Sequence, residues 1–392
     1  MSFVALRRTL FTVHMWAGLI LGILLAALGL SGSLLVYEDA VSDLLSPPPH
    51  ATTAGMPLPL SMIANMARDA ATQQGVEGGA MQIILPQKTS DAVEVRFNGI
   101  SPMGNPPAAN GAGRGQPARG LQMFLDPVSG EVLSTAHAVR HPILIFAHQL
   151  HGNFLIGRGF GRSFVSWLGA AMCLLGLTGL ILWWPKRGQW QYAFKVRSGA
   201  TGLRFHRELH AATGIWIFLI FMAVSFSGVV IAWPQTMNLA MGMNASALGP
   251  RLVPTVEPLE GKRLGPTEAM IAATAAVPGL RPVSIIMPAR PDRPIIVNYL
   301  SHDAVAAALA IDPYRGKVLG IRDASEHFLA WMRPVHQGSL GPVWRFLVFL
   351  SGLVPTLFVV TGITMWWKKR QRHVPMTMMA GDITADEAAL DI

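Results

Sequence analysis

Residues 10–36 read LFTVHMWAGLILGILLAALGLSGSLLV and contain no Asp, Glu, Lys or Arg. About 20 apolar residues in a helix are enough to cross the hydrocarbon core of a bilayer. This stretch therefore predicts a membrane-spanning helix. It is too long for a signal peptide, and Tyr37-Glu38-Asp39, which follows it, is not a small-residue cleavage site. We expect it to stay attached as an anchor.

Three further runs of the same kind follow, at Phe164–Trp184, Ala211–Trp233 and Phe346–Trp367. Together the four runs explain a composition that is 51% hydrophobic and only 14% charged, whereas soluble domains carry roughly 25% charged residues. The sequence therefore predicts a mainly α-helical integral membrane protein, with four transmembrane helices packed as a bundle in the lipid bilayer.

Basic residues indicate how the spans are oriented. They gather before the first span, between the second and third, and after the fourth: Arg7, Arg8, Lys186, Arg187, Lys195, Arg197, Arg204, Arg207, Lys368, Lys369, Arg370 and Arg372. Because Lys and Arg are enriched in short cytoplasmic segments, both termini are expected in the cytoplasm. The two long, nearly neutral segments then face the other side, the periplasm of a Gram-negative bacterium. This distribution argues against nucleic-acid binding, despite the net charge of +9.

The chain reads as an internal duplication. The first and third spans share a histidine, a glycine four residues later and a Ser-Gly pair at the same offset: His14, Gly18 and Ser31-Gly32, against His210, Gly214 and Ser227-Gly228. The second and fourth spans both end in Thr-Gly, then a Trp-Trp pair and basic residues. Both halves run from inside to outside and back, which predicts two parallel repeats related by an axis along the membrane normal.

The outer segments repeat as well. Each contains an Asp-Pro-x-x-Gly turn, at Asp126–Gly130 and Asp312–Gly316, between two stretches typical of strands. Each turn follows further strand-like runs and a helical stretch, at Ser61–Gln73 and Pro266–Ala276. The sequence therefore predicts two periplasmic α+β domains.

These features divide the chain into ten segments. The expected spans are residues 10–36, 163–184, 206–233 and 343–367. The periplasmic domains are 37–140 and 234–322, followed by outer histidine-bearing helices and turns at 141–162 and 323–342. A basic cytoplasmic loop covers 185–205, and a cytoplasmic tail covers 368–392. We expect Ser101–Gly120, rich in Gly and Pro, to be a mobile insertion, and the acidic tail after Val374 to be disordered.

Six of the twelve histidines lie at the ends of the spans: His14, His206 and His210 inside, and His148, His151 and His336 outside. The duplication pairs His14 with His210 and His151 with His336. Two imidazoles facing each other across the pseudo-twofold axis can serve as axial ligands of one haem. Glycines after these histidines leave room for a large planar group. The pattern favours two stacked haems. His206 and His148 could each replace a neighbouring ligand or donate a hydrogen bond behind it.

Other interpretations stay open. Single histidines at a membrane interface are often structural, and several together could hold zinc or copper, although few carboxylates accompany them. A proton relay would need Asp or Glu within the apolar runs, which contain none. Beyond the haem ligands we find no candidate catalytic residues. The only cysteine, Cys173, excludes an intrachain disulfide.

These motifs resemble the PepSY-associated transmembrane (PepSY-TM) family of bacterial inner-membrane proteins. The resemblance extends from His14 to Trp367 and rests on the His-Gly-Ser-Gly pattern, the Thr-Gly and Trp-Trp ends and the Asp-Pro-x-x-Gly turns. Within the family the chain is most similar to FoxB-type ferrisiderophore reductases. That resemblance implies periplasmic PepSY domains and haem b in the membrane, held by histidines at the positions of His14, His210, His151 and His336. It also implies reduction of ferric siderophore in the periplasm, with release of Fe(II) for iron uptake.

The resemblance also bears on partners. Some relatives carry a fused flavin reductase domain, but this sequence has no Gly-x-Gly-x-x-Gly motif after a strand. The electron donor is therefore expected to be separate, either membrane quinol or a cytoplasmic flavoprotein. One alternative is a cytochrome b relay to another periplasmic acceptor. Another is a PepSY module that anchors a periplasmic partner at the membrane, with histidines that are only structural.

Overall fold

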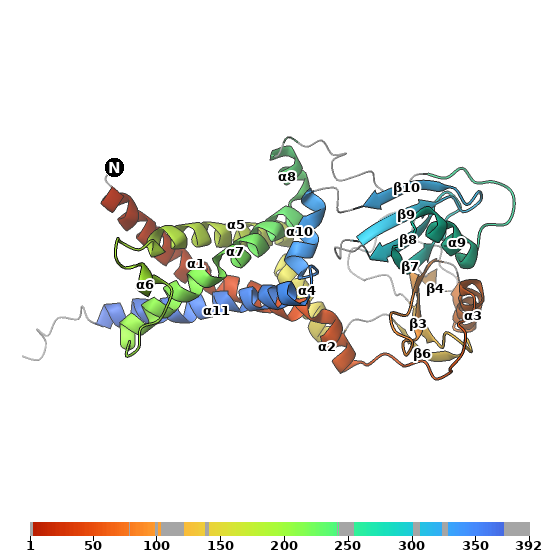
Figure 1. Ribbon diagram of the computed structural model, residues 1–392, viewed down its shortest axis with the longest axis horizontal. Helices are drawn as coiled ribbons and strands as arrows, with labels where there is room; N and C mark the ends of the chain where they lie inside the picture. The colour runs from red at the N-terminus through yellow and green to blue at the C-terminus, as the bar shows by residue number, and fades with distance from the viewer. Residues whose placement is uncertain are drawn as a thin grey trace, which may run out of the picture. The chain divides into compact units, whose positions relative to one another are not determined.

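The computed structural model describes residues 3–77, 79–98, 101–102, 121–137, 141–240, 242, 255–300, 306–323 and 328–371. The chain divides into two compact units (Figure 1). The helical unit comprises Met1–Val36, Ala147–Ala232 and Phe346–Ile392, and the sheet unit comprises Tyr37–Phe146 and Trp233–Arg345. The predicted mobile insertion, apart from residues 101–102, and the predicted disordered tail lie outside the described residues.

Four long helices dominate the helical unit: α1 (Phe3–Val36), α5 (Arg158–Trp183), α7 (Gly202–Ala232) and α11 (Pro342–Gln371). Each is long and apolar enough to cross a membrane, which confirms the four predicted spans. Several helices continue beyond their apolar runs. The helix α7 begins at Gly202, before the predicted span. Arg204 and Arg207 therefore lie in the first turns of this helix and not in the preceding loop. Two short helices, α4 (Pro142–Asn153) and α6 (Trp190–Ala193), precede α5 and α7.

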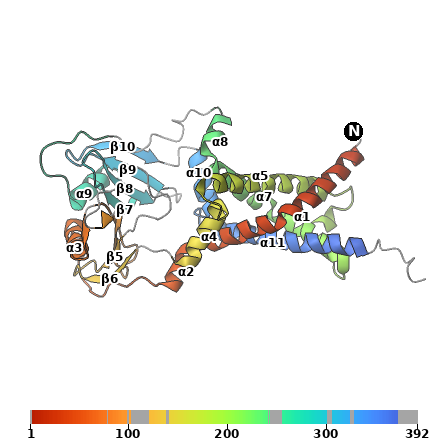
Figure 2. The same cartoon turned by 180° about the vertical axis from the view of Figure 1, so that it is seen from behind.

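Glycines let the long helices approach closely at two crossings. In α1 and α11, which lie side by side in Figure 2, a Cβ added to Gly29 would collide with the carbonyl oxygen of Gly352. In α5 and α7, a Cβ on Gly169 would lie 2.9 Å from Val229 Cγ2 and 3.7 Å from the carbonyl oxygen of Ser225. Small residues bring helix backbones into contact in this way in membrane proteins.

The sheet unit contains one continuous antiparallel sheet of eight strands, in the order β10-β9-β8-β7-β2-β3-β5-β6. The strands are β2 (Ala80–Ile84), β3 (Val93–Asn98), β5 (Leu121–Leu125), β6 (Val132–His137), β7 (Arg281–Met287), β8 (Ile295–Leu300), β9 (Ala306–Ile311) and β10 (Val318–Asp323). A separate pair consists of β1 (Val76–Glu77) and β4 (Ser101–Pro102). The halves of the large sheet join where β2 pairs with β7, with Ile83 opposite Ile285. The sequence predicted the two α+β segments but not this junction.

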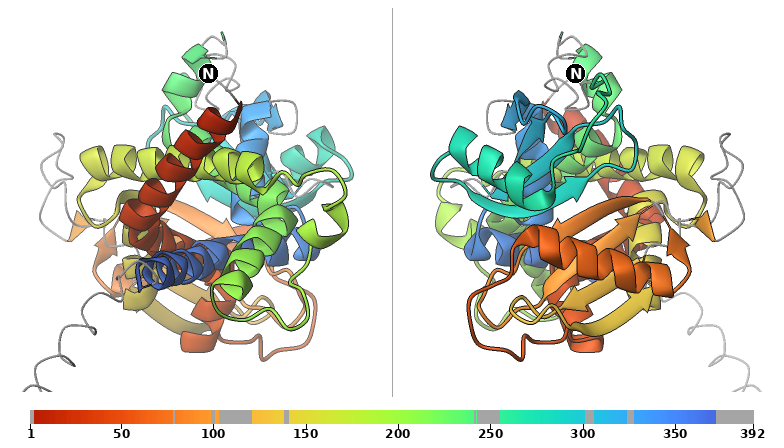
Figure 3. Two further views of the ribbon diagram at one scale, coloured as in Figure 1. Left: turned by 90° about the vertical axis from the view of Figure 1, so that its left-hand side faces the viewer. Right: turned by 90° about the vertical axis from the view of Figure 1, so that its right-hand side faces the viewer.

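Two helices cover one face of the sheet. They are α3 (Leu60–Gln73) and α9 (Pro266–Ala276), drawn in orange and teal in Figure 3, and they match the two predicted helical stretches. Alternate strand residues from both halves pack beneath them in one apolar core, including the fully buried Ile83 and Ile285. Where the helices begin, the backbone N–H of Ser61 donates to Thr267 Oγ1 at 2.9 Å, and the N–H of Thr267 donates to Ser61 Oγ at 3.2 Å. Each hydroxyl thus satisfies an N–H group that has no partner within its own helix.

The two predicted Asp-Pro-x-x-Gly turns connect β5 to β6 and β9 to β10. Their glycines, Gly130 and Gly316, have φ of 74° and 67°, which glycine adopts without strain. Burial opposes ionisation of Asp126, but backbone N–H groups of Ser129, Val128, Thr52 and Thr53 hold the pKa of its carboxyl well below the usual range. The unit also contains α2 (Glu38–Leu45), α8 (Pro234–Ala240) and α10 (Phe328–Gln337).

Candidate functional site

His14 on α1 and His210 on α7 are neighbours inside the helical unit. Both side chains are partly buried, and their ring centroids lie 6.4 Å apart with the ring planes at 78°. Two imidazoles on opposite sides of one metal ion, each about 2 Å from it, would have centroids about 6 Å apart. The spacing therefore fits a pair of axial ligands, and the structure brings together the two histidines that the duplication paired.

A threonine contacts each of these histidines. Nδ1 of His14 lies 2.9 Å from Thr178 Oγ1 on α5, and Nδ1 of His210 lies 2.8 Å from Thr361 Oγ1 on α11. These threonines occupy matching places in the repeated Thr-Gly motif. The sequence showed that motif but could not show what it contacts, because spacing along a chain does not reveal which spans pack together.

Two of the glycines next to this site have open space around them. A Cβ added to Gly18, one helical turn after His14, or to Gly362, next to Thr361, would meet no atom within 4 Å. On the other side of the pair, the Phe358 ring packs against His210 with centroids 4.5 Å apart. A flat apolar group could approach the helices at Gly18 and Gly362.

His151 lies in the last turn of α4 and packs against α1. Its Nδ1 lies 2.9 Å from the carbonyl oxygen of Leu28, and a Cβ added to Gly32 would lie 2.7 Å from its Cε1. A carbonyl oxygen only accepts hydrogen bonds, so Nδ1 carries the proton and Nε2 carries a lone pair. Phe154 and Leu155 follow with φ of 52° and 62°. Such values are strained for bulky residues, and strain of this kind often occurs at functional sites.

The other two histidines that the sequence predicts on the outer side, His148 and His336, lie on α4 and α10. His148 lies one turn before His151 on α4. His336 lies in the last turn of α10, which belongs to the sheet unit. The pairing of His151 with His336 therefore stays a prediction.

His206 lies one turn before His210 on α7. Its Nδ1 is buried and, among the described residues, has no hydrogen-bond partner. Buried polar atoms are nearly always paired, so an orphan of this kind is a place where a bound group could donate or accept a hydrogen bond. Whether His206 replaces a neighbouring ligand or donates a hydrogen bond behind it stays a prediction.

Within the described ranges, no group of three or more His, Cys, Asp or Glu side chains gathers closely enough to hold a metal ion. Zinc or copper bound by several histidines stays an alternative prediction.

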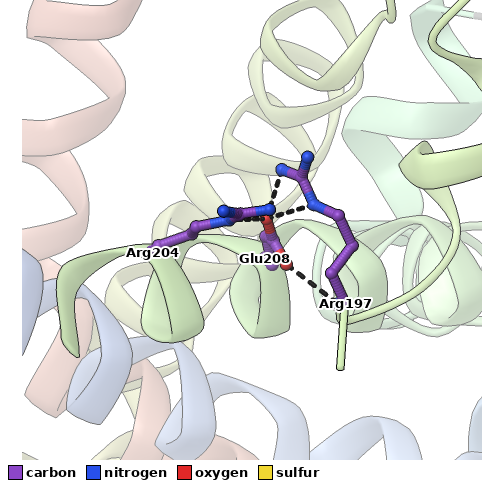
Figure 4. Close-up of polar contacts among 3 residues, drawn as sticks. All are labelled: Arg197, Arg204 and Glu208. Carbon is purple, nitrogen blue, oxygen red and sulfur yellow. Dashed lines mark hydrogen bonds and ion pairs between the residues drawn. The ribbon is translucent and has the colours of Figure 1, made fainter. Parts of the chain in front are cut away.

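One buried carboxylate near the site was missed by the sequence reasoning. Glu208, between His206 and His210 on α7, is only 9% exposed and binds Arg197 and Arg204 (Figure 4). Glu208 Oε2 accepts the backbone N–H of Arg197 at 2.9 Å, and Oε1 accepts from Nε of Arg197 at 2.7 Å and of Arg204 at 2.9 Å. These bonds attach the loop before α7 to the helix that carries His210. The Arg204–Glu208 spacing of four residues was the available signal.

No curated protein matches the sequence. A family profile described as the PepSY-associated TM region matches residues 11–369. That match covers all four apolar helices almost completely, together with the whole sheet unit between them. The chain therefore belongs to the family defined by the PepSY-associated TM region.

Proposed function

We propose that this protein is a haem-containing reductase of the bacterial inner membrane, which passes electrons across the bilayer to ferric siderophore in the periplasm and releases Fe(II). The observation that carries the proposal is the pair formed by His14 and His210, two imidazoles at ligand spacing between apolar helices. Family membership agrees with it. The choice of ferric siderophore as the electron acceptor rests on the resemblance of the sequence motifs to FoxB-type reductases.

In this proposal, His14 and His210 would hold an inner haem b, and His151 would be a ligand of a second haem, for which the duplication in the sequence pairs it with His336. When bound, haem supplies a one-electron Fe(III)/Fe(II) couple. The chain's own contribution is to orient the imidazoles and to surround them with apolar side chains. These apolar side chains would exclude water from the bound group.

The proposed topology has two parallel repeats and cytoplasmic termini. Matching contacts support the repeats, because Nδ1 of His14 contacts Thr178 in the same way that Nδ1 of His210 contacts Thr361. The helix crossing at Gly29 and Gly352 likewise has its counterpart at Ser225 and Gly169. The basic residues flanking the spans support the orientation. The sheet unit is then periplasmic, and the inner histidine pair lies on the side where quinol or a flavoprotein would deliver electrons.

The substrate chemistry places few demands on side chains. Siderophores hold Fe(III) through hard oxygen ligands and hold the softer Fe(II) far less tightly. One electron added to the ferric complex therefore labilises it, and the protein has neither to bind the iron directly nor to transfer a proton. This is consistent with a site made of imidazoles without a general acid–base pair.

Anaerobic mixing tests the proposal. Dithionite-reduced protein in detergent, freed of excess reductant, is mixed with a ferric siderophore in the presence of a chelator specific for Fe(II). We expect the reduced haem α band to decay as chelated Fe(II) accumulates in equal amount. The gallium(III) form of the same siderophore has the same shape but is not reducible under these conditions, so it should leave the α band unchanged.

Two outcomes would overturn the proposal at different levels. A protein without Soret and α bands after expression with ample haem would refute any electron-transfer function. Reduced haem that stays reduced with several ferric siderophores, yet is oxidised by an artificial acceptor, would refute the siderophore assignment and favour a relay to another periplasmic acceptor.

A further inference from the structure

The two threonines that contact the inner histidines do more than fill space. We propose that Thr178 and Thr361 are positioning residues for the inner haem, each fixing the ligating tautomer and the ring orientation of one histidine. This inference rests on the proposed haem function. It adds that two hydroxyl groups on different spans control how tightly one haem is held and at what potential it is reduced.

The direction of each hydrogen bond follows from the bonds around the hydroxyl groups. Thr178 Oγ1 lies 2.8 Å from the carbonyl oxygen of Leu174, and Thr361 Oγ1 lies 2.8 Å from that of Leu357. A carbonyl oxygen only accepts, so the single hydroxyl proton points towards it. The threonine oxygen is then left as an acceptor for the histidine. Nδ1 of His14 and of His210 must therefore carry the imidazole proton.

This assignment leaves Nε2 of both rings with a free lone pair, which is the form that binds iron. An imidazole without a partner at Nδ1 would populate both tautomers and rotate more freely. Ligating histidines generally donate their other N–H to a fixed acceptor for this reason. Here the acceptor is fixed in turn, because each hydroxyl is bonded to its own helix backbone.

The neighbouring groups keep each ring over its threonine. The His14 ring lies beside Gly179, next to Thr178: a Cβ added there would be in ordinary van der Waals contact with His14 Cε1, at 3.4 Å. Phe358 packs against His210, with ring centroids 4.5 Å apart, and limits rotation of that imidazole. Thr178 with Gly179 thus neighbours one ring, and Thr361 with Phe358 neighbours the other.

The outer histidine His151 provides an internal comparison. Its Nδ1 donates to the main-chain carbonyl of Leu28, an acceptor that no side-chain substitution removes. Donation from Nδ1–H makes Nε2 a stronger electron donor, which favours Fe(III) and lowers the reduction potential. Removing the threonine hydroxyls should therefore raise the potential of the inner haem only.

The test is spectroelectrochemical titration of the full-length protein with Thr178→Val, Thr361→Val and the double substitution. Each single change should raise the midpoint potential of the same one of two haems. Each should also speed transfer of that haem to a scavenger such as apomyoglobin, and the double change should have the larger effect. Thr178→Ser and Thr361→Ser keep the hydroxyl and should restore both values.

Thr364→Val is the matched control. Thr364 lies on α11 three residues after Thr361, and its hydroxyl also donates to its own helix, to the carbonyl oxygen of Val360 at 2.7 Å. Its substitution should leave both haems unchanged. Valine variants that lose the inner haem while the serine variants keep it would also support the proposal.

Three results would overturn it. Unchanged potentials and transfer rates in both valine variants would show that the hydroxyl groups do not act on the ligands. Effects on two different haems would show that His14 and His210 do not share one. Serine variants whose midpoint potentials and haem-transfer rates change as much as those of the valine variants would show that the threonines act only through packing. A wild-type protein without haem would refute the proposed function itself, which is a separate outcome.

Discussion

At Gly32, an added side chain would displace the ring of a proposed haem ligand. The imidazole of His151 lies against this glycine, and a Cβ there would be 2.7 Å from Cε1. Gly32→Ala should displace the ring, break its bond to Leu28 and cost about 1–3 kcal/mol through overpacking. We expect the outer haem to be lost or its spectrum altered while the inner haem stays. Haem content and low-temperature α-band spectra measure this.

Gly159→Ala is the matched control, because a Cβ at Gly159 would meet no atom within 4 Å. An outer haem that is equally stable in both variants would show that His151 is not its ligand, or that the ring can move without consequence.

Asp126 is the residue whose titration should matter most in the sheet unit. Burial would raise its pKa, but four backbone N–H groups keep the pKa well below the usual value near 4. A carboxyl with a depressed pKa stabilises the fold above its unfolded pKa, and that stabilisation is lost as the pH falls towards its folded pKa. Unfolding of the sheet unit should therefore become easier below about pH 4.

Asp126→Asn removes this titration. Thermal unfolding followed by circular dichroism should show a variant that is less stable at pH 7 and whose stability changes less between pH 7 and pH 3. A variant with the same pH dependence as the wild type would show that other carboxyls dominate.

At the scale of elements, α1 and α11 approach each other closely where they cross. A Cβ on Gly352 would lie 2.6 Å from the carbonyl oxygen of Gly29 and would collide with Ser33 Oγ. Because both helices would have to separate, Gly352→Ala should cost about 1–3 kcal/mol. Unfolding in a denaturing detergent measures the loss. A stability equal to that of the wild type, or to that of Gly159→Ala, would show that the two helices do not pack through this pair.

The elements themselves could largely be predicted from the sequence. The spans follow from charge-free apolar runs, and the helices α3 and α9 and the Asp-Pro-x-x-Gly turns follow from local patterns. Local patterns do not show which elements pack against each other or which strands pair. The pairing of β2 with β7 joins residues far apart in the chain, and either strand could equally have remained an edge. The contacts of Thr178 and Thr361 with histidines were likewise invisible, since they depend on which spans are neighbours.

For the whole molecule, we expect one topology, with cytoplasmic termini and a periplasmic sheet unit. In a Cys173→Ser background, a cysteine introduced at Ser129, an exposed residue in the turn after Asp126, should react with a membrane-impermeant maleimide in spheroplasts. A cysteine at Lys195, in the basic loop, should react only after permeabilisation. The reverse labelling pattern would show that the protein has the opposite orientation, with the His14–His210 pair near the periplasm.

The proposed function depends most on His14 and His210 being the two ligands of one haem. Haem content per protein and the reduced-minus-oxidised spectrum should be measured for the purified wild type, His14→Ala and His210→Ala. We expect Soret and α bands with two haems in the wild type, and in each variant the loss of the same haem while the other remains. Wild-type protein without haem, or two variants that keep both haems, would contradict it.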